Sequence, residues 1–149
     1  MKRLGIFLDT GNLYYCIGKK FEKRKLDYRK YLDYLADLGE ATRATAYGCQ
    51  LNSEAVGFMH CLKQIGLQTK WKTVKNHKAN WDVGMAIDIV RMADRIDSVI
   101  LGTSNPNLVP VVEYITQLGI DVIVVACGIS KELKEAATDF IEIPESMLE

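Results

Sequence analysis

The chain has 149 residues, of which 48% are apolar and 26% charged. This balance is typical of one globular domain with a buried core, and it excludes a disordered chain. We expect a single domain over residues 1–149. No apolar run approaches the roughly 18 to 20 residues that cross a bilayer. We therefore expect no membrane association. The basic residues that follow Met1 lead into an apolar stretch that is too short for a secretory signal, so we expect a cytoplasmic location.

Positive and negative charges balance, but they are unevenly distributed along the chain. Nineteen basic residues match nineteen acidic ones. The basic residues concentrate over 19–30 and 63–78, whereas the last third is acidic. Such asymmetry can direct phosphate ligands to one side of a neutral protein. A solvated helix face explains the first basic stretch equally well.

The first predicted element is a buried strand followed by a helix. Residues 4–8 are apolar at every position, which predicts a central parallel strand covered on both faces. A polar turn over 9–12 follows, and Asn12 is the expected N-cap of the first helix. Apolar residues at helical spacing predict a second helix over 28–38, ended by Gly39.

The middle of the chain predicts a strand over 44–49 and then a helix that begins at Asn52 or Ser53. Residues 67–74 alternate between apolar and polar, which is typical of a strand with one solvated face at a sheet edge. An edge strand that bears Trp71 would suit pairing into a homodimer.

A helix over 81–95 carries Asp82 and Asp88 among residues that are apolar nearly all round, so we expect it to be deeply buried. The remaining predicted elements are a strand over 98–101, a helix over 107–118, a strand over 121–127, a helix from Ser130 and an extended piece over 140–143.

Strands that alternate with helices predict right-handed crossovers and a mostly parallel sheet. In such folds ligands bind beyond the carboxyl ends of the strands. Asp9 ends the first strand, Asp82 begins a helix, and the polar loop 103–107 follows the fourth strand. These oxygen donors are of the kind that Mg²⁺ prefers. The alternative is that Asp82 is only a favourable acid at a helix N-terminus.

At four places in order, the chain resembles the NYN (LabA-like) family of the PIN-like nucleases. Residues 7–14 contain the family's D-x-x-N-L-Y turn, and residues 82–88 match its D-V-x-x-A-x-D helix. Residues 103–112 are similar to S-G-D-x-D-F-x-P-L-V, and residues 130–141 are similar to S-x-x-L-x-x-A-A-D-x-F-I. Each motif alone is weak, whereas four in register are specific.

The resemblance implies an α/β, three-layer, Rossmann-like PIN-type fold whose mostly parallel sheet has about five strands in the order 3-2-1-4-5. It also implies a ribonuclease that binds Mg²⁺ or Mn²⁺ and cleaves RNA phosphodiesters. The family's catalytic positions fall on Asp9, Asp82, Asn105 and Asn107. Asp9 and Asp82 would hold the metal with Asn105 as a weaker third ligand, and Asn12 would brace the pocket and contact the substrate.

Asn105 and Asn107 depart from the family pattern, which has carboxylates at both positions. An amide offers a carbonyl oxygen but cannot take a proton from water. One charge lost about 4 Å from another changes their interaction by roughly 4 kcal/mol at an effective dielectric constant of about 20. We therefore expect weak metal binding and slow hydrolysis. The alternative is a catalytically impaired RNA-binding or protein-interaction module on the same fold.

Further residues are candidates for contacts with RNA. Lys78 and Ser104 could contact phosphates, and Trp81 could stack on an unpaired base. The alternative is that Trp81 packs as a hydrophobic staple at a helix start. Asp88 and Thr103 are expected to support the site.

Two other classes of protein fit the first turn less well. Phosphatases with an aspartyl nucleophile need a second Asp where this chain has Gly11. Dinucleotide-binding proteins need a G-x-G-x-x-G turn after the first strand, and this chain has none there.

Overall fold

The computed structural model describes residues 1–50, 54–73 and 80–149. Within these residues, six parallel strands form one sheet in the order β3-β2-β1-β4-β5-β6. The strands are β1 (Arg3–Asp9), β2 (Glu40–Gln50), β3 (Gln68–Thr73), β4 (Ser98–Gly102), β5 (Asp121–Ala126) and β6 (Asp139–Glu142).

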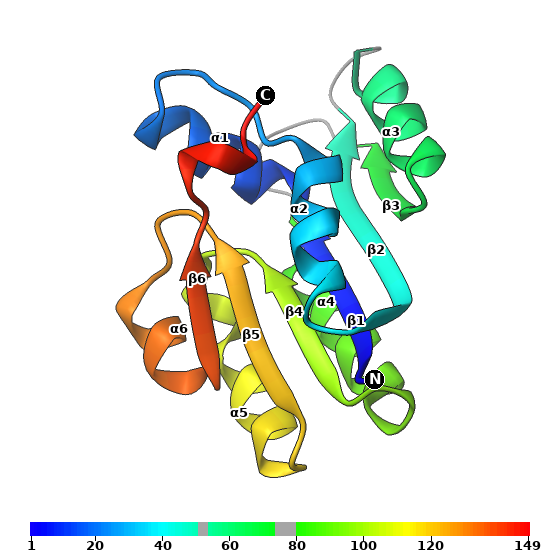
Figure 1. Ribbon diagram of the computed structural model, residues 1–149, viewed down its shortest axis with the longest axis vertical. Helices are drawn as coiled ribbons and strands as arrows, with labels where there is room; N and C mark the ends of the chain where they lie inside the picture. Colours follow the sequence, from blue (N-terminus) through cyan, green and yellow to red (C-terminus); the bar gives the residue numbers. More distant parts are fainter. Residues whose placement is uncertain (51–53, 74–79) are drawn as a thin grey trace.

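Helices cover both faces of the sheet and complete a three-layer α/β arrangement. In Figure 1, α2 lies in front of the sheet, and α4 and α5 lie behind it. The helices are α1 (Thr10–Lys20), α2 (Tyr28–Ala36), α3 (Glu54–Gln64), α4 (Asp82–Met92), α5 (Val109–Gln117) and α6 (Lys131–Ala136), with 3-10 turns η1 (Ala93–Arg95), η2 (Pro106–Leu108) and η3 (Glu145–Met147). No helix in these ranges is both long and apolar enough to cross a membrane.

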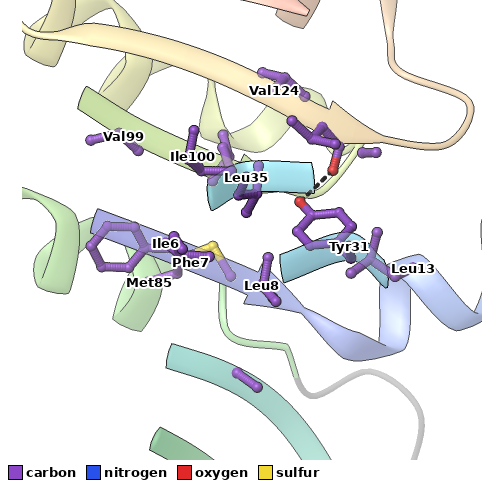
Figure 2. Packing of buried hydrophobic residues seen from close by; sticks show 14 of the residues in the cluster. Ile6, Phe7, Leu8, Leu13, Tyr31, Leu35, Met85, Val99, Ile100 and Val124 are labelled. Carbon is purple, nitrogen blue, oxygen red and sulfur yellow. Dashed lines mark hydrogen bonds between the residues drawn. The ribbon is translucent and has the colours of Figure 1, made fainter. Parts of the chain in front are cut away.

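Strand β1 is the centre of the sheet and of the core. It pairs in parallel with β2 on one side and β4 on the other, and Phe7 and Leu8 are fully buried. Figure 2 shows the packing around it, where the Tyr31 hydroxyl of α2 donates a hydrogen bond of 2.8 Å to the Val125 carbonyl oxygen of β5. The all-apolar run over 4–8 had predicted this central position, and the prediction is confirmed.

The predicted order 3-2-1-4-5 is confirmed, and a sixth strand extends it. Strand β6 pairs in parallel with β5 through Ile123↔Asp139 and the following residues. The sequence indicated only an extended piece there, because β6 is an edge strand whose Phe140 is exposed, so it lacks the apolar run of a central strand.

The first helix begins earlier than predicted. Thr10 is already helical, and the N-cap is Asp9, whose side chain accepts a hydrogen bond from the backbone N–H of Asn12. The prediction of Asn12 as the cap was therefore wrong, because the strand ends directly in the capping residue without an intervening turn. The predicted starts of the next crossover helix, Asn52 or Ser53, lie outside the described residues.

The expectation that α4 is deeply buried was also wrong. Met85, Ile89 and Met92 face the core, whereas Val83 and Ile87 are 73% and 51% exposed. The helix belongs to an outer layer, so the sheet covers only one of its faces. An apolar composition does not distinguish such a helix from a fully buried one.

The C-terminal segment returns to the connection between α1 and α2. Leu26 and Leu148 form an isolated antiparallel bridge. The backbone N–H of Glu149 donates to the Lys25 carbonyl oxygen at 2.9 Å, and Arg24 forms an ion pair with Glu145 at 2.6 Å. Residues 24–27 are thus held by the far end of the chain.

Candidate functional site

The candidate site lies where β1 and β4 end and α4 begins. Asp9 is the last residue of β1, and Asp82 is the first residue of α4. The Nδ2 groups of Asn105 and Asn107, from the loop after β4, donate hydrogen bonds of 2.9 and 3.0 Å to Oδ2 of Asp82. The structure thus brings Asp82 together with both asparagines.

Asp9 completes this acidic pair from the end of β1, the strand beside β4. Burial raises the pKa of the Asp9 carboxyl, and the negative charge of Asp82 raises it further. Hydrogen bonds from the backbone N–H groups of Asn12 and Gly11 act in the other direction and lower this pKa. The two carboxylates are therefore close enough to repel each other across the site.

The orientation of the Asn105 amide follows from its hydrogen bonds. Its Oδ1 accepts from the backbone N–H of Asn107 at 3.0 Å, which turns its NH₂ group toward Asp82. A flipped amide would set oxygen against oxygen and NH₂ against N–H. The amides of Asn105 and Asn107 therefore stabilise the Asp82 charge in the way that a bound cation would.

Asn12 connects the helix after β1 to the loop after β4. Its Oδ1 accepts hydrogen bonds from the backbone N–H and the hydroxyl of Ser104, at 3.0 and 3.1 Å. The Ser104 hydroxyl also lies 3.4 Å from the Cys16 sulfur, and the serine is buried. The Thr103 hydroxyl oxygen accepts from the backbone N–H of Asn105 at 3.3 Å. These bonds fix the loop that carries the asparagines.

Trp81 forms the wall of the site beside Asp82. Its indole N–H donates to the Gly48 carbonyl oxygen at 2.8 Å, and its ring centroid lies 5.3 Å from that of Tyr47. The Lys72 ammonium group lies 4.3 Å from the Trp81 ring centroid. A half-buried aromatic ring with a cation beside it thus adjoins the acidic pair. Lys78, the other predicted contact in this part of the chain, lies outside the described residues.

Asp88 does not share the site with Asp82. Its carboxylate, 18% exposed, accepts from the Tyr47 hydroxyl at 2.8 Å and forms an ion pair with Lys70 at 2.7 Å. It lines a separate cavity of about 400 Å³ between α4 and the sheet.

Basic residues from β2, β3, α4 and η1 also line this cavity, and the sequence did not single them out as a group. They are Arg43, Lys70, Arg91 and Arg95. Arg91 and Arg95 are one helical turn apart, and this spacing was the only signal in the sequence. Nothing local indicated that β2 and β3 face them.

Asp9 and Asp82 are the kind of oxygen donors that a divalent cation can use. Across residues 1–50, 54–73 and 80–149, no three His, Cys, Asp or Glu side chains gather as a metal centre. Mg²⁺, however, is often bound by only one or two carboxylates together with water and substrate phosphate. Asp82 Oδ1 accepts no hydrogen bond from the described residues, so Asp9 and Asp82 could supply such a pair.

Comparisons with known proteins agree with this architecture. The NYN domain family matches residues 3–145. The fold is similar to the crystal structure of a protein of unknown function, VPA0982, from Vibrio parahaemolyticus, with a TM-score of 0.92, 25% identity, and coverage of 99% of this chain and 96% of that one. A weaker likeness, with a TM-score of 0.41 and 9% identity over 91% of this chain and 48% of that one, is to the Vibrio vulnificus NanR protein complexed with ManNAc-6P.

No curated protein matches the chain in sequence. The family match nevertheless spans all six strands of the sheet and includes each strand end that forms the candidate site. The chain belongs to the NYN domain family of the PIN-like superfamily.

Proposed function

We propose that this protein is a divalent-metal-dependent ribonuclease that cleaves RNA phosphodiesters slowly. The observation that supports this most directly is the closeness of Asp9, at the carboxyl end of β1, to Asp82, at the start of α4, in an NYN domain. In parallel α/β sheets this edge is where ligands bind. The two asparagines beside Asp82 account for the slow rate.

Some residues of the site would bind the cation, and others would position the loop and the RNA. Asp9 and Asp82 would hold the cation, with Asn105 and Asn107 beside it as the remaining members of the family's catalytic set. A cation there would polarise a phosphoryl oxygen and lower the pKa of a bound water. Asn12 and Ser104 position the loop, and the half-buried Trp81 ring would stack on an RNA base. Since neither asparagine can accept a proton, the attacking water lacks a strong base.

A second candidate function is RNA binding without hydrolysis. It is favoured by the two amide N–H groups that already stabilise the Asp82 carboxylate. A carboxylate that is satisfied by neutral donors gains less from a cation than one surrounded by other carboxylates. On this alternative the site would recognise RNA and leave the phosphodiester intact.

The deciding experiment measures cleavage of single-stranded RNA with increasing Mn²⁺ or Mg²⁺, and with EDTA. We expect slow, metal-dependent cleavage that Asp9→Asn and Asp82→Asn each reduce by at least about a hundredfold, since each removes a charge from the metal site. The matched control is Asp33→Asn, an exposed carboxylate on α2. Equal activity in Asp9→Asn and the wild type would refute this assignment. RNA binding without any metal-dependent cleavage would establish the second candidate.

A further inference from the structure

The cavity between α4 and the sheet is basic, unlike the acidic site at the strand ends. Its volume is about 400 Å³. Its charged lining consists of Arg43 from β2, Lys70 from β3, and Asp88, Arg91 and Arg95 from α4 and the turn after it. Four cations therefore face one carboxylate in a concave surface.

The positive charge of this cavity is mostly uncompensated. The only carboxylate in the lining, Asp88, is bound to Lys70 and to the Tyr47 hydroxyl. Arg43, Arg91 and Arg95 make no hydrogen bond or ion pair with any residue in the described part of the chain. Like charges gathered around a hollow repel one another and concentrate the field there. An anion would relieve this repulsion.

The chemistry of the three arginines indicates which anion fits. A guanidinium group is planar, always charged, and donates two parallel hydrogen bonds to phosphate oxygens. It is also more weakly hydrated than an ammonium group, so it gives up water to a ligand at lower cost. Three such groups around one cavity are suited to a phosphate ester.

The arrangement of the cations favours a chain of phosphates over a single one. In the sheet register Tyr47 lies opposite Lys70, and Cys49 lies opposite Lys72. Arg43 is therefore six strand residues from the level of Lys72, a distance of about 20 Å. A single phosphate spans only a small part of that length, whereas an extended strand of nucleic acid can follow it.

Basic residues also lie between the cavity and the acidic site. Lys70 and Lys72 point from the same face of β3, since side chains two apart on a strand share a face. Lys72 lies against the Trp81 ring, and Trp81 directly precedes Asp82. Tyr47, which contacts both Trp81 and Asp88, lies in register with Asp9. Side chains in contact therefore connect the cavity with the acidic site.

We propose that this cavity is a second binding site on the protein, which holds backbone phosphates of the RNA strand away from the point of cleavage. This inference rests on the proposed function for the class of ligand. The strand passes over Trp81 and Lys72, and its phosphates then bind Lys70, Arg91, Arg43 and Arg95.

The test is a set of binding titrations with fluorescent single-stranded RNA of increasing length, in EDTA so that no cleavage occurs. The variant Arg43→Gln/Arg91→Gln/Arg95→Gln is compared with Arg29→Gln/Lys63→Gln/Lys131→Gln. The control removes the same charge from α2, α3 and α6, outside the cavity. Thermal unfolding confirms that both variants fold, which we expect because every residue changed is exposed.

For the wild type we expect affinity to rise with RNA length once the strand reaches the cavity. The cavity variant should lose this rise and bind long RNA at least about tenfold more weakly, with a salt slope shallower by about two for three lost phosphate contacts. The control should bind like the wild type. Equal losses in the two variants, or no binding of RNA by the wild type, would overturn the proposal.

Competition by adenosine 5′-monophosphate and by inorganic phosphate distinguishes a strand from a small ligand. If either displaces long RNA at concentrations close to that of the RNA itself, the cavity is a small-molecule site and the proposal is wrong. The outcome is separate from the cleavage experiment. If RNA binds through the cavity but is not cleaved, only the proposed hydrolysis is refuted. If RNA is cleaved but the cavity variant binds it like the wild type, only the proposed second site is refuted.

Discussion

Asp9 combines two roles that act against each other in the free protein. It caps α1, yet its charge is half-buried and close to that of Asp82. Because the folded protein raises the pKa of this carboxyl, folding favours the protonated form. Its contribution to stability is fully present below the unfolded pKa and is lost as the pH rises through the folded pKa.

We predict that Asp9→Asn stabilises the metal-free protein at neutral pH by about 0.5 to 2 kcal/mol, a gain typical of substitutions at functional sites. Asn caps a helix as well as Asp does, so α1 keeps its cap. Urea unfolding in EDTA at pH 4 to 8 measures the effect, which should shrink toward the acidic end. Asp9→Ala, which loses the cap, should show no such gain. A pH-independent effect of Asp9→Asn would contradict this explanation.

The double variant Asn105→Asp/Asn107→Asp replaces two amides that donate to Asp82 by two carboxylates that can bind a metal ion. Both amides donate to Asp82 Oδ2, so replacement by carboxylates turns two attractive contacts into repulsive ones. We predict a lower melting temperature in EDTA, a larger rise on addition of Mn²⁺, and Mn²⁺ affinity at least about tenfold higher than in the wild type. Calorimetric titration and thermal unfolding measure these changes. Unchanged Mn²⁺ affinity would count against the position of the metal site.

At the scale of elements, the contact between β2 and β3 depends on a glycine. A Cβ atom at Gly48 would lie 2.4 Å from the nearest ring atoms of Trp71, and that ring packs at 6.1 Å from Phe58 of α3. We predict that Gly48→Ala destabilises the protein by about 1 to 3 kcal/mol through this overpacking. Chemical denaturation gives the value. The control is Gly57→Ala on α3, where a Cβ meets nothing within 4 Å and should stabilise the helix by up to about 1 kcal/mol.

The sequence predicted elements well where the residue pattern has only one structural explanation. The run over 4–8 is apolar at every position, so it predicted a central strand, and the helix predicted from Ser130 is α6, which Ser130 caps. The pattern failed where the burial or pairing of a residue depends on which other elements pack against it. The exposure of Val83 depends on which face of α4 meets the sheet, and the pairing of β6 depends on the strand beside it.

The same distinction applies to the sites. The closeness of Asp9, Asp82 and Asn105 follows from the rule that parallel strands end at one edge, so motif order was enough to predict it. Their catalytic roles remain predictions. The basic cavity was not predicted because its arginines come from β2 and from α4 and η1. These elements are distant in sequence and become neighbours only through the crossover from β3 to β4.

At the scale of the whole molecule, a chain with no net charge separates its charges in space. The carboxylates Asp9 and Asp82 lie at one edge of the sheet, and the arginines lie beside α4, with Trp81 and Tyr47 between them. This separation allows one protein to favour a cation at one place and phosphates at another. The overall isoelectric point, about 6.7, gives no indication of it.

The bridge between Leu26 and Leu148 ties an early part of the protein to a very late one. During translation, residues 24–27 therefore lack the partners that the C-terminal segment supplies until residues 145–149 have emerged from the ribosome. The loop that joins α1 to α2 should then be among the last parts of the domain to become protected from proteases, although it is among the first to be made.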